Sequence, residues 1–317
     1  MKLFSLRRAL MVAACASASL LAACGSGTTE SAISPSRFVV FGDAFSDVGQ
    51  SGAVYSVNDG SVANWVQQMA SRFSQTVTPS SSGGFDYARV NARVLAKPDA
   101  VGNSATLTIK EQVDTFLATN AIGGSDVMIL SAGVSDVVAQ MNAVTAGTQT
   151  EDQMIANLQQ AGRDLGAQVR RVVQAGGKQV IVVGPYTLGR TPWAIGLNKV
   201  DLLNNASGKF NDALLVSIVD LGANVLYVDA AYYLNLVTGD PGSYSLANGT
   251  TVVCNSVDPT NAIGIGANQV NSAKCTPSTV TAGLIYNSYA FADPLFFTPV
   301  VNRLFGDYAY NKIRDRF

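Results

Sequence analysis

The stretch FVVFGDAFSDVG, Phe38–Gly49, has an alanine where a reactive side chain would be expected. Its apolar first half is typical of a buried strand, and the strand leads into a tight turn in which Asp43 and Asp47 stand on either side of Ala44. Nucleophilic catalysis needs an oxygen, sulfur or nitrogen atom that can attack the substrate. Alanine offers none, so the turn has the setting of a reactive residue without the residue itself.

The composition argues against several other kinds of catalytic or binding site. The chain of 317 residues is 48% hydrophobic and contains no histidine, which excludes the usual general base at neutral pH and the commonest metal ligand. Its 21 Lys and Arg nearly balance its 22 Asp and Glu, without a long run of one sign. This pattern predicts a globular protein with a large core and no nucleic-acid partner, and we expect no cofactor.

Four aspartates could meet at one place: Asp43, Asp47, Asp136 and Asp293. Carboxylates that converge without a cationic partner can bind a divalent ion. The first three, however, follow predicted strands, where carboxylates commonly cap helix N-termini and bind free N–H groups. We therefore favour the capping role and predict no metal site.

The elements that position these residues alternate between apolar runs of strand length and segments with helical periodicity. This alternation is typical of βα units around a parallel sheet covered on both faces. The turns after the strands should lie along one edge of the sheet, where open α/β folds bind ligands. Strands are predicted at 37–41, 126–132, 179–184 and 224–228, and helices at 61–73, 109–117, 152–175, 210–221 and 299–313, the first of them capped by Ser61.

Five segments in the right order resemble the SGNH/GDSL family of serine esterases and lipases. They are Gly42–Gly49, Gly83–Val94, Ser131–Asp136, Gly189–Pro192 together with Lys209–Leu215, and Asp293–Thr298. The resemblance implies an α/β fold, a flavodoxin-like three-layer α/β/α sandwich with a central parallel sheet, over residues 37–317, with its cleft at the strand ends. It also implies hydrolysis of ester bonds by a serine, a histidine oriented by a carboxylate, and oxyanion donors.

The positions equivalent to the family's catalytic residues have changed, except for the carboxylate Asp293. Ala44 replaces the serine, Phe296 replaces the histidine, and Ser135 replaces an asparagine donor. Asn91 follows Val90 where a glycine pair is expected, and Asn302 stands at the position of a second histidine. The sequence therefore predicts a catalytically inactive relative with a binding or scaffolding role.

Two other functions remain open. One is a degenerate but active ester hydrolase of the carboxylesterase or lipase type, acting on acyl or acetyl esters, in which Ser46 or a lysine supplies the chemistry. The other is a purely structural role, favoured if Phe296 and Phe297 fill the vacated cleft. Tyr286, Tyr289 and Phe291 could line an aromatic groove, although core packing is the more common role for such residues.

The N-terminus resembles a bacterial lipoprotein signal. Residues 1–23 combine a basic start with a short apolar stretch that ends in LAAC at Cys24. The thiol of Cys24 would be acylated, and residues 24–36 would form a flexible tether to a membrane. We thus expect a lipoprotein of the cell envelope with an unknown envelope ligand or protein partner, and we favour the outer membrane as the site of its anchor. The alternatives are lipidation at Cys15 and an ordinary cleaved signal peptide.

Two cysteines, Cys254 and Cys275, remain in a stretch rich in Asn, Gly, Thr and Ser. An exported chain meets an oxidising compartment, in which an isolated pair is normally bridged. We therefore predict a disulfide between them. Two thiolates without histidine do not complete a zinc site.

Overall fold

A parallel sheet of four strands forms the centre of the protein. The computed structural model describes residues 33–317, so Cys15, Cys24 and the predicted signal lie outside the described residues. The strands stand side by side in chain order: β1 (Arg37–Gly42), β2 (Asp126–Ser131), β3 (Gln179–Val183) and β4 (Val225–Tyr227). All four predicted strands are present to within about two residues at each end, because apolar runs buried on both faces are hard to misplace.

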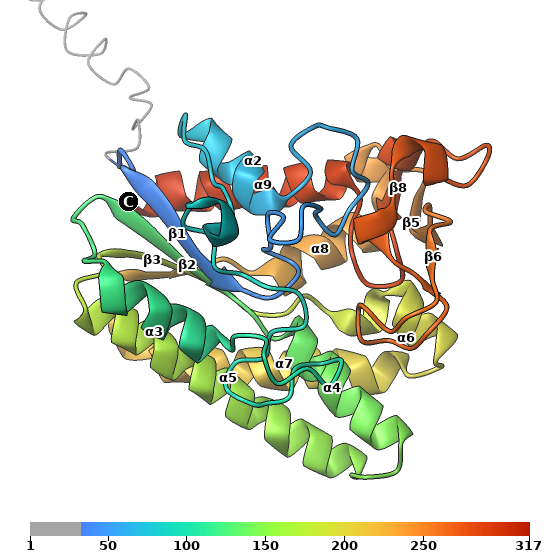
Figure 1. The fold of residues 1–317 in the computed structure, drawn as a ribbon, viewed down its shortest axis with the longest axis horizontal. Coiled ribbons are helices and arrows are strands. Elements are labelled where there is room, and N and C mark those ends of the chain that lie inside the picture. Colours follow the sequence, from blue (N-terminus) through green and yellow to red (C-terminus); the bar gives the residue numbers. More distant parts are fainter. Residues whose placement is uncertain (1–32) are drawn as a thin grey trace, which may run out of the picture. The chain divides into compact units, whose positions relative to one another are not determined.

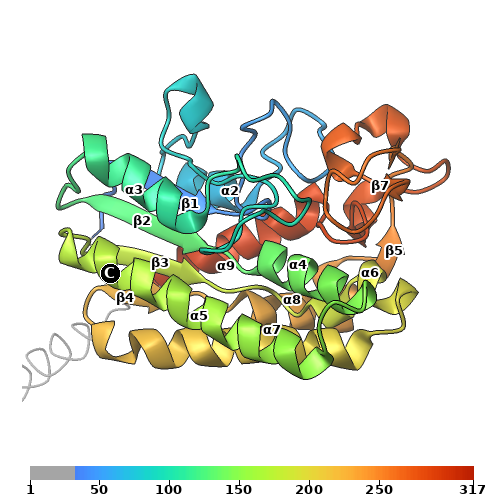
Figure 2. The ribbon, with the colours of Figure 1, turned by 60° about the horizontal axis from the view of Figure 1, so that its bottom comes forward.

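Helices cover both faces of the sheet, as Figures 1 and 2 show, and the predicted three-layer α/β/α architecture is confirmed. On one face lie α3 (Ile109–Thr119), α5 (Glu151–Gln174) and α7 (Val200–Ile218). On the other face lie α2 (Trp65–Arg72), α8 (Ala230–Gly239) and α9 (Pro299–Arg316). Helices α4 (Val134–Thr145) and α6 (Pro192–Gly196) lie beyond the carboxyl ends of the strands.

Local capping decides where several helices begin. The predicted cap Ser61 is wrong, because Asn64 accepts the N–H of Val66 and starts α2 there, whereas Ser61 hydrogen-bonds to Asp59. Thr150 forms a capping box at the start of α5.

The two longest helices of the first face, α5 and α7, pack closely because α5 carries small residues at the contact. A Cβ on Gly162 would overlap the carbonyl oxygen of Phe210, and a Cβ on Gly166 would lie 2.5 Å from the Cβ of Ser217. Helix α7 begins ten residues earlier than predicted, since the burial of Leu203 and Ala206 in the core outweighs the weak helix propensity of an Asn- and Gly-containing segment.

A further short segment lines the outer edge of β1. The N–H of Val40 donates to Phe85 O at 2.9 Å, and the N–H groups of Tyr87 and Arg89 donate back to Val40 O and Gly42 O. Residues 85–89 therefore cover the edge of β1 and bring the second family-like segment to the end of that strand.

The region after α8 forms a small subregion of its own. Strand β5 (Asn248–Val252) pairs with β8 (Tyr289–Phe291), and β6 (Val257–Asp258) pairs with β7 (Gln269–Val270). The predicted disulfide is confirmed: Cys254 and Cys275 are joined, with 5.9 Å between their Cα atoms. Both sulfurs lie in a small apolar core separate from the main one.

Several residues just before the predicted boundary at residue 37 pack with the domain. Ile33 and Pro35, expected in the tether, are buried, and the Ser36 hydroxyl donates to Asp126 at 3.0 Å. The last residues of the predicted tether therefore belong to the domain. Within residues 33–317, no helix combines the length and the apolar character needed to cross a membrane.

Candidate functional site

The family-like segments meet where the strands end, and hydrogen bonds and ring contacts join them. Ala44 follows β1 directly and is 3% exposed. The ring of its neighbour Phe45 contacts the rings of Tyr186, after β3, and of Phe297, in the last segment. Three distant parts of the chain thus meet beside Ala44, as the predicted sheet edge required.

Asp43 lies fully buried beside Ala44 and reaches across to α4. Its carboxylate accepts the N–H groups of Phe45 at 3.1 Å, Gly133 at 3.2 Å and Ser135 at 3.3 Å. Burial, together with a smaller effect of the nearby Asp136, raises the pKa of Asp43 to about 7 in spite of these donors. Asp43 therefore caps a helix, but that helix is α4, which follows β2, and not a helix that follows β1.

Asp47 holds the turn of the first segment and connects it to the second. It accepts the N–H groups of Gly49 and Gln50, at 2.9 and 2.8 Å, and that of Val90 at 3.3 Å. Asn91, at the family's glycine position, has a φ of 62°. Asparagine tolerates this left-handed conformation better than most residues, so the glycine-like backbone is retained without glycine.

The amide of Asn91 has a new partner. Its Nδ2 donates to Ala262 O at 2.8 Å, in the disulfide-containing region. Sequence reasoning predicted the loss of the glycine but not the retained backbone conformation. The substitution converts a position that lets substrate approach into one that anchors a neighbouring loop.

Ser135 and Asp136 start α4 and differ in what they bind. The N–H of Ser135 donates to Asp43, and its hydroxyl makes no hydrogen bond within the part of the chain that is described. Asp136 is buried, accepts the N–H of Val94 at 3.0 Å and lies 3.5 Å from Nε of Arg93. Burial raises the pKa of Asp136 to about 6, and the Arg93 guanidinium opposes this shift.

Asp293 no longer orients a base. It accepts the N–H groups of Leu295 and Phe296, at 2.8 and 2.7 Å, and that of Ser272 at 2.9 Å. Burial raises the pKa of Asp293 above its ordinary value. The side chain of Phe296 is buried, with its residue 4% exposed, and its ring centroid lies 5.3 Å from that of Tyr55. The histidine position has thus become part of the core.

The four aspartates considered as ion ligands each bind backbone N–H groups instead. Among residues 33–317, no group of three or more Cys, Asp or Glu side chains has the arrangement of a metal site. As in helix caps, the four carboxylates accept backbone N–H groups. The N–H groups that Asp47, Asp136 and Asp293 bind, however, do not belong to the helices that follow these residues.

Two residues of the centre were missed by sequence reasoning. The Tyr186 hydroxyl donates to Leu295 O at 2.7 Å, and burial raises its pKa well above the ordinary range. Ser272 binds Asp293 through its N–H and is itself fully buried. The position of Tyr186, three residues after the end of β3, was a usable signal. Ser272 begins a short 3₁₀ helix, Ser272–Lys274, which no sequence pattern indicated.

Comparison with known protein families shows the family to which this chain is similar. The family model described as GDSL-like Lipase/Acylhydrolase matches residues 38–308. The chain belongs to this GDSL-like family. It is also 28% identical over 297 residues to the Pseudomonas putida protein called "Uncharacterized protein in trpE-trpG intergenic region". That match covers 87% of this chain and 48% of the relative, so the chain spans about half the length of that protein.

In this centre, the positions that the resemblance assigns to the nucleophile and the base carry apolar side chains. Ala44 offers no nucleophile and Phe296 no proton acceptor. Ser46, the candidate substitute nucleophile, is 0% exposed, and its hydroxyl has no hydrogen-bond partner among the described residues. A hydroxyl without a base and without access to substrate is not activated for attack.

Proposed function

We propose that this chain is a non-catalytic member of the GDSL-like family with a binding or scaffolding role at the bacterial cell envelope. The observation that carries the proposal is the burial of both key positions, with Ala44 3% and Phe296 4% exposed. A nucleophile and its base must reach the same substrate carbon and proton. Here both positions carry apolar side chains that pack into the core.

The expected loss of rate is large. Removing a nucleophile or its base costs on the order of 10⁶ in turnover, and removing one oxyanion donor costs about 10² to 10³, although such losses are not additive. At the donor position, Ser135 presents a hydroxyl in place of an amide. Little catalysis over the uncatalysed reaction is expected to remain.

Hydrolysis of short-chain aryl esters by the purified protein tests this proposal. We expect turnover no faster than that of a heat-denatured sample, and no labelling by a serine-directed fluorophosphonate. Ala44→Ser alone should change little, because the new hydroxyl still lacks a base. A combined variant, Ala44→Ser with Ser135→Asn and Phe296→His, should gain measurable activity, since these roles act as a unit.

The matched control is Ser46→Ala, which removes the remaining hydroxyl of the first segment. Robust wild-type turnover that Ser46→Ala abolishes would refute the proposal and establish an active ester hydrolase. Wild-type turnover that Ser46→Ala leaves unchanged and that copurifies with another protein would count as contamination, which rechromatography of the activity identifies.

We also propose that acylation of Cys24 anchors the protein to a membrane. The motif Leu21–Cys24 after a short apolar stretch supports this proposal. Mass spectrometry of detergent-extracted protein should find an acylated N-terminal Cys24, and Cys24→Ala should move the protein to the soluble fraction. An unmodified mature protein that begins elsewhere would refute the anchor and leave the proposal about catalysis untouched.

A further inference from the structure

A polar pocket of about 350 Å³ lies between α4, α5 and the segment Arg93–Ala96. We call it the α4–α5 pocket. Asp136 and Gln140 face it from α4, and Asn157 and Asp164 face it from α5. It adjoins the degenerate centre, because Arg93 and Asp136 belong to the second and third family-like segments, but it contains none of the positions of the missing catalytic residues. Its volume is that of ordinary small-molecule sites.

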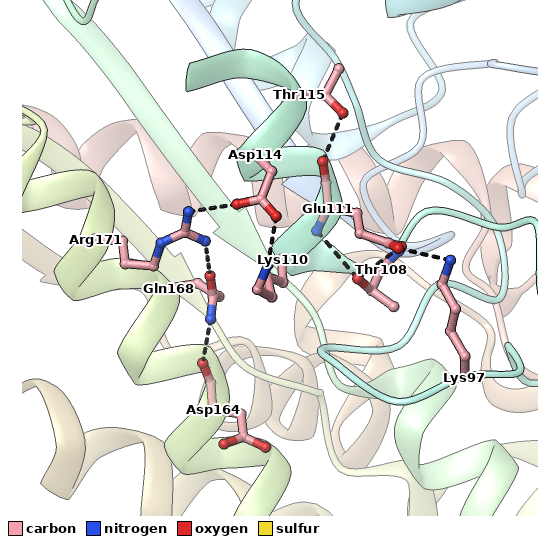
Figure 3. A network of polar contacts seen from close by, with 9 residues as sticks. All are labelled: Lys97, Thr108, Lys110, Glu111, Asp114, Thr115, Asp164, Gln168 and Arg171. Atoms are coloured by element: carbon pink, nitrogen blue, oxygen red, sulfur yellow. Dashed lines mark hydrogen bonds and ion pairs between the residues drawn. The ribbon is translucent and has the colours of Figure 1, made fainter. Parts of the chain in front are cut away.

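Its walls are braced rather than loosely packed. Figure 3 shows the polar network beside it, in which Arg171 of α5 binds Asp114 of α3 at 2.5 Å. Gln168 accepts from Arg171 at 2.6 Å and donates to the carbonyl oxygen of Asp164. Lys97, directly after the pocket segment, binds Glu111 of α3 at 2.8 Å. The network thus ties α5 and the end of the segment Arg93–Ala96 to α3, and so it holds two of the three walls of the pocket.

The polar groups of the pocket are oriented, yet they retain free hydrogen-bonding capacity. The Arg93 guanidinium is held by Asp136 and by Pro98 O, and its Nη2 makes no hydrogen bond within residues 33–317. Gln160 donates to Oδ1 of Asp164 at 2.8 Å, and Oδ2 of Asp164 has no partner in the same part of the chain. A fixed donor and a fixed acceptor therefore face the pocket together.

The amides of the rim repeat this pairing. Nδ2 of Asn157 donates to Oε1 of Gln140 at 2.9 Å. This bond leaves Nε2 of Gln140 as a donor and Oδ1 of Asn157 as an acceptor, neither with a partner among the described residues. Half-exposed Leu95 and buried Leu158 add an apolar surface between the polar groups.

This mixture of groups selects the chemistry of the ligand. An anion would accept from Arg93 and Gln140 but would lie near two carboxylates, whereas an ammonium ion would leave both donors unpaired. A hydroxyl both donates and accepts, so neighbouring hydroxyls satisfy all four groups while C–H groups contact Leu95. We propose that the α4–α5 pocket binds a sugar ring of a neutral saccharide. This inference does not depend on whether the old centre is active.

Saturation-transfer NMR and calorimetry with a panel of neutral mono- and disaccharides test the proposal, with glucuronate and glucosamine as charged comparisons. At least one neutral sugar should bind more tightly than either charged one. Ala161→Trp, which places a large ring in the pocket, should abolish binding, and Asp164→Ala should weaken it about tenfold by removing a charge-assisted hydrogen bond. The control Asp315→Ala, at an exposed aspartate of α9, should leave affinity unchanged.

Binding of no neutral sugar, or binding that Ala161→Trp leaves intact, would overturn the assignment. Tighter binding of glucuronate or of glucosamine would overturn the neutral class in favour of an anionic or a cationic ligand. Thermal melting of each variant near that of the wild type shows that a lost signal reflects the pocket. Because no ester is used as a probe, failure here leaves the proposed loss of catalysis unaffected.

Discussion

Loss of the proton on Asp43 should make the protein less stable as the pH rises through neutrality. Burial raises the pKa of Asp43 to about 7, from an ordinary value of 3.8. Between these two values the folded state keeps a proton that the unfolded state has released. The contribution of Asp43 to the free energy of unfolding is therefore fully present below pH 3.8 and is lost as the pH rises through 7.

The magnitude follows from the two pKa values. Linkage gives a total loss of about 4 kcal/mol for Asp43, of which roughly 3 kcal/mol falls between about pH 5 and pH 8. Asp136, with a pKa raised to about 6, contributes in the same direction over the lower part of this range. Carboxyl groups with lowered pKa values, such as Asp126, change the free energy of unfolding only below about pH 5, so they do not mask this trend.

Urea unfolding at several pH values between about 5 and 8 measures this effect. The free energy of unfolding of the wild type should fall with pH, and that of Asp43→Asn should fall less, because only the wild type can release this proton. Asp315→Asn serves as the control and should follow the wild type. If the curves of wild type and Asp43→Asn run parallel, Asp43 is ionised in its ordinary range, and burial does not dominate the three N–H donors.

Three other predictions concern stability and use the same unfolding measurement. Gly162→Ala should cost about 1 to 3 kcal/mol by overpacking the contact of α5 with α7, whereas Gly208→Ala, at an open helical position, should stabilise by roughly 0.5 to 1 kcal/mol; equal effects would refute the close-packing argument. Asn91→Gly should cost about 1 kcal/mol and Asn91→Val more, because the φ of 62° disfavours a branched side chain; a harmless valine would contradict it. Replacing Cys254 and Cys275 by serine should cost about 3 kcal/mol, and no change would show that the bridge adds nothing.

The sequence predicted the sheet well because its signal is local. The apolar runs at β1 and β3 are buried on both faces, and burial of this kind leaves a continuous hydrophobic pattern. The first half of α7 was not predicted, because its helix is stabilised by packing of Leu203 and Ala206 in the core rather than by propensity. This packing depends on residues that are distant in the chain, so a short stretch of sequence does not reveal it.

The candidate site was predicted by position but not by contact. The motifs predicted that Ala44, Asn91 and Phe296 would lie where turn segments after parallel strands meet. In the structure Ala44 follows β1, and the ring of its neighbour Phe45 contacts that of Phe297. The motifs did not predict that Asp43 binds the start of α4 or that Ser272 binds Asp293. Both contacts join segments far apart in the chain through backbone N–H groups, which every residue type offers, so no residue pattern marks them.

The substitutions at the old centre share a physical consequence, which is that each position now contributes to the fold. Ala44 and Phe296 belong to the apolar core, and Asn91 anchors a loop through Ala262. Asp293 accepts three N–H groups, whereas a carboxylate offers about four acceptor sites. One site therefore remains for a histidine at position 296, but that ring would have to replace the packing of the phenylalanine. A single substitution such as Ala44→Ser would meet side chains that already pack in the core, and so activity is expected only when nucleophile, base and donor are introduced together.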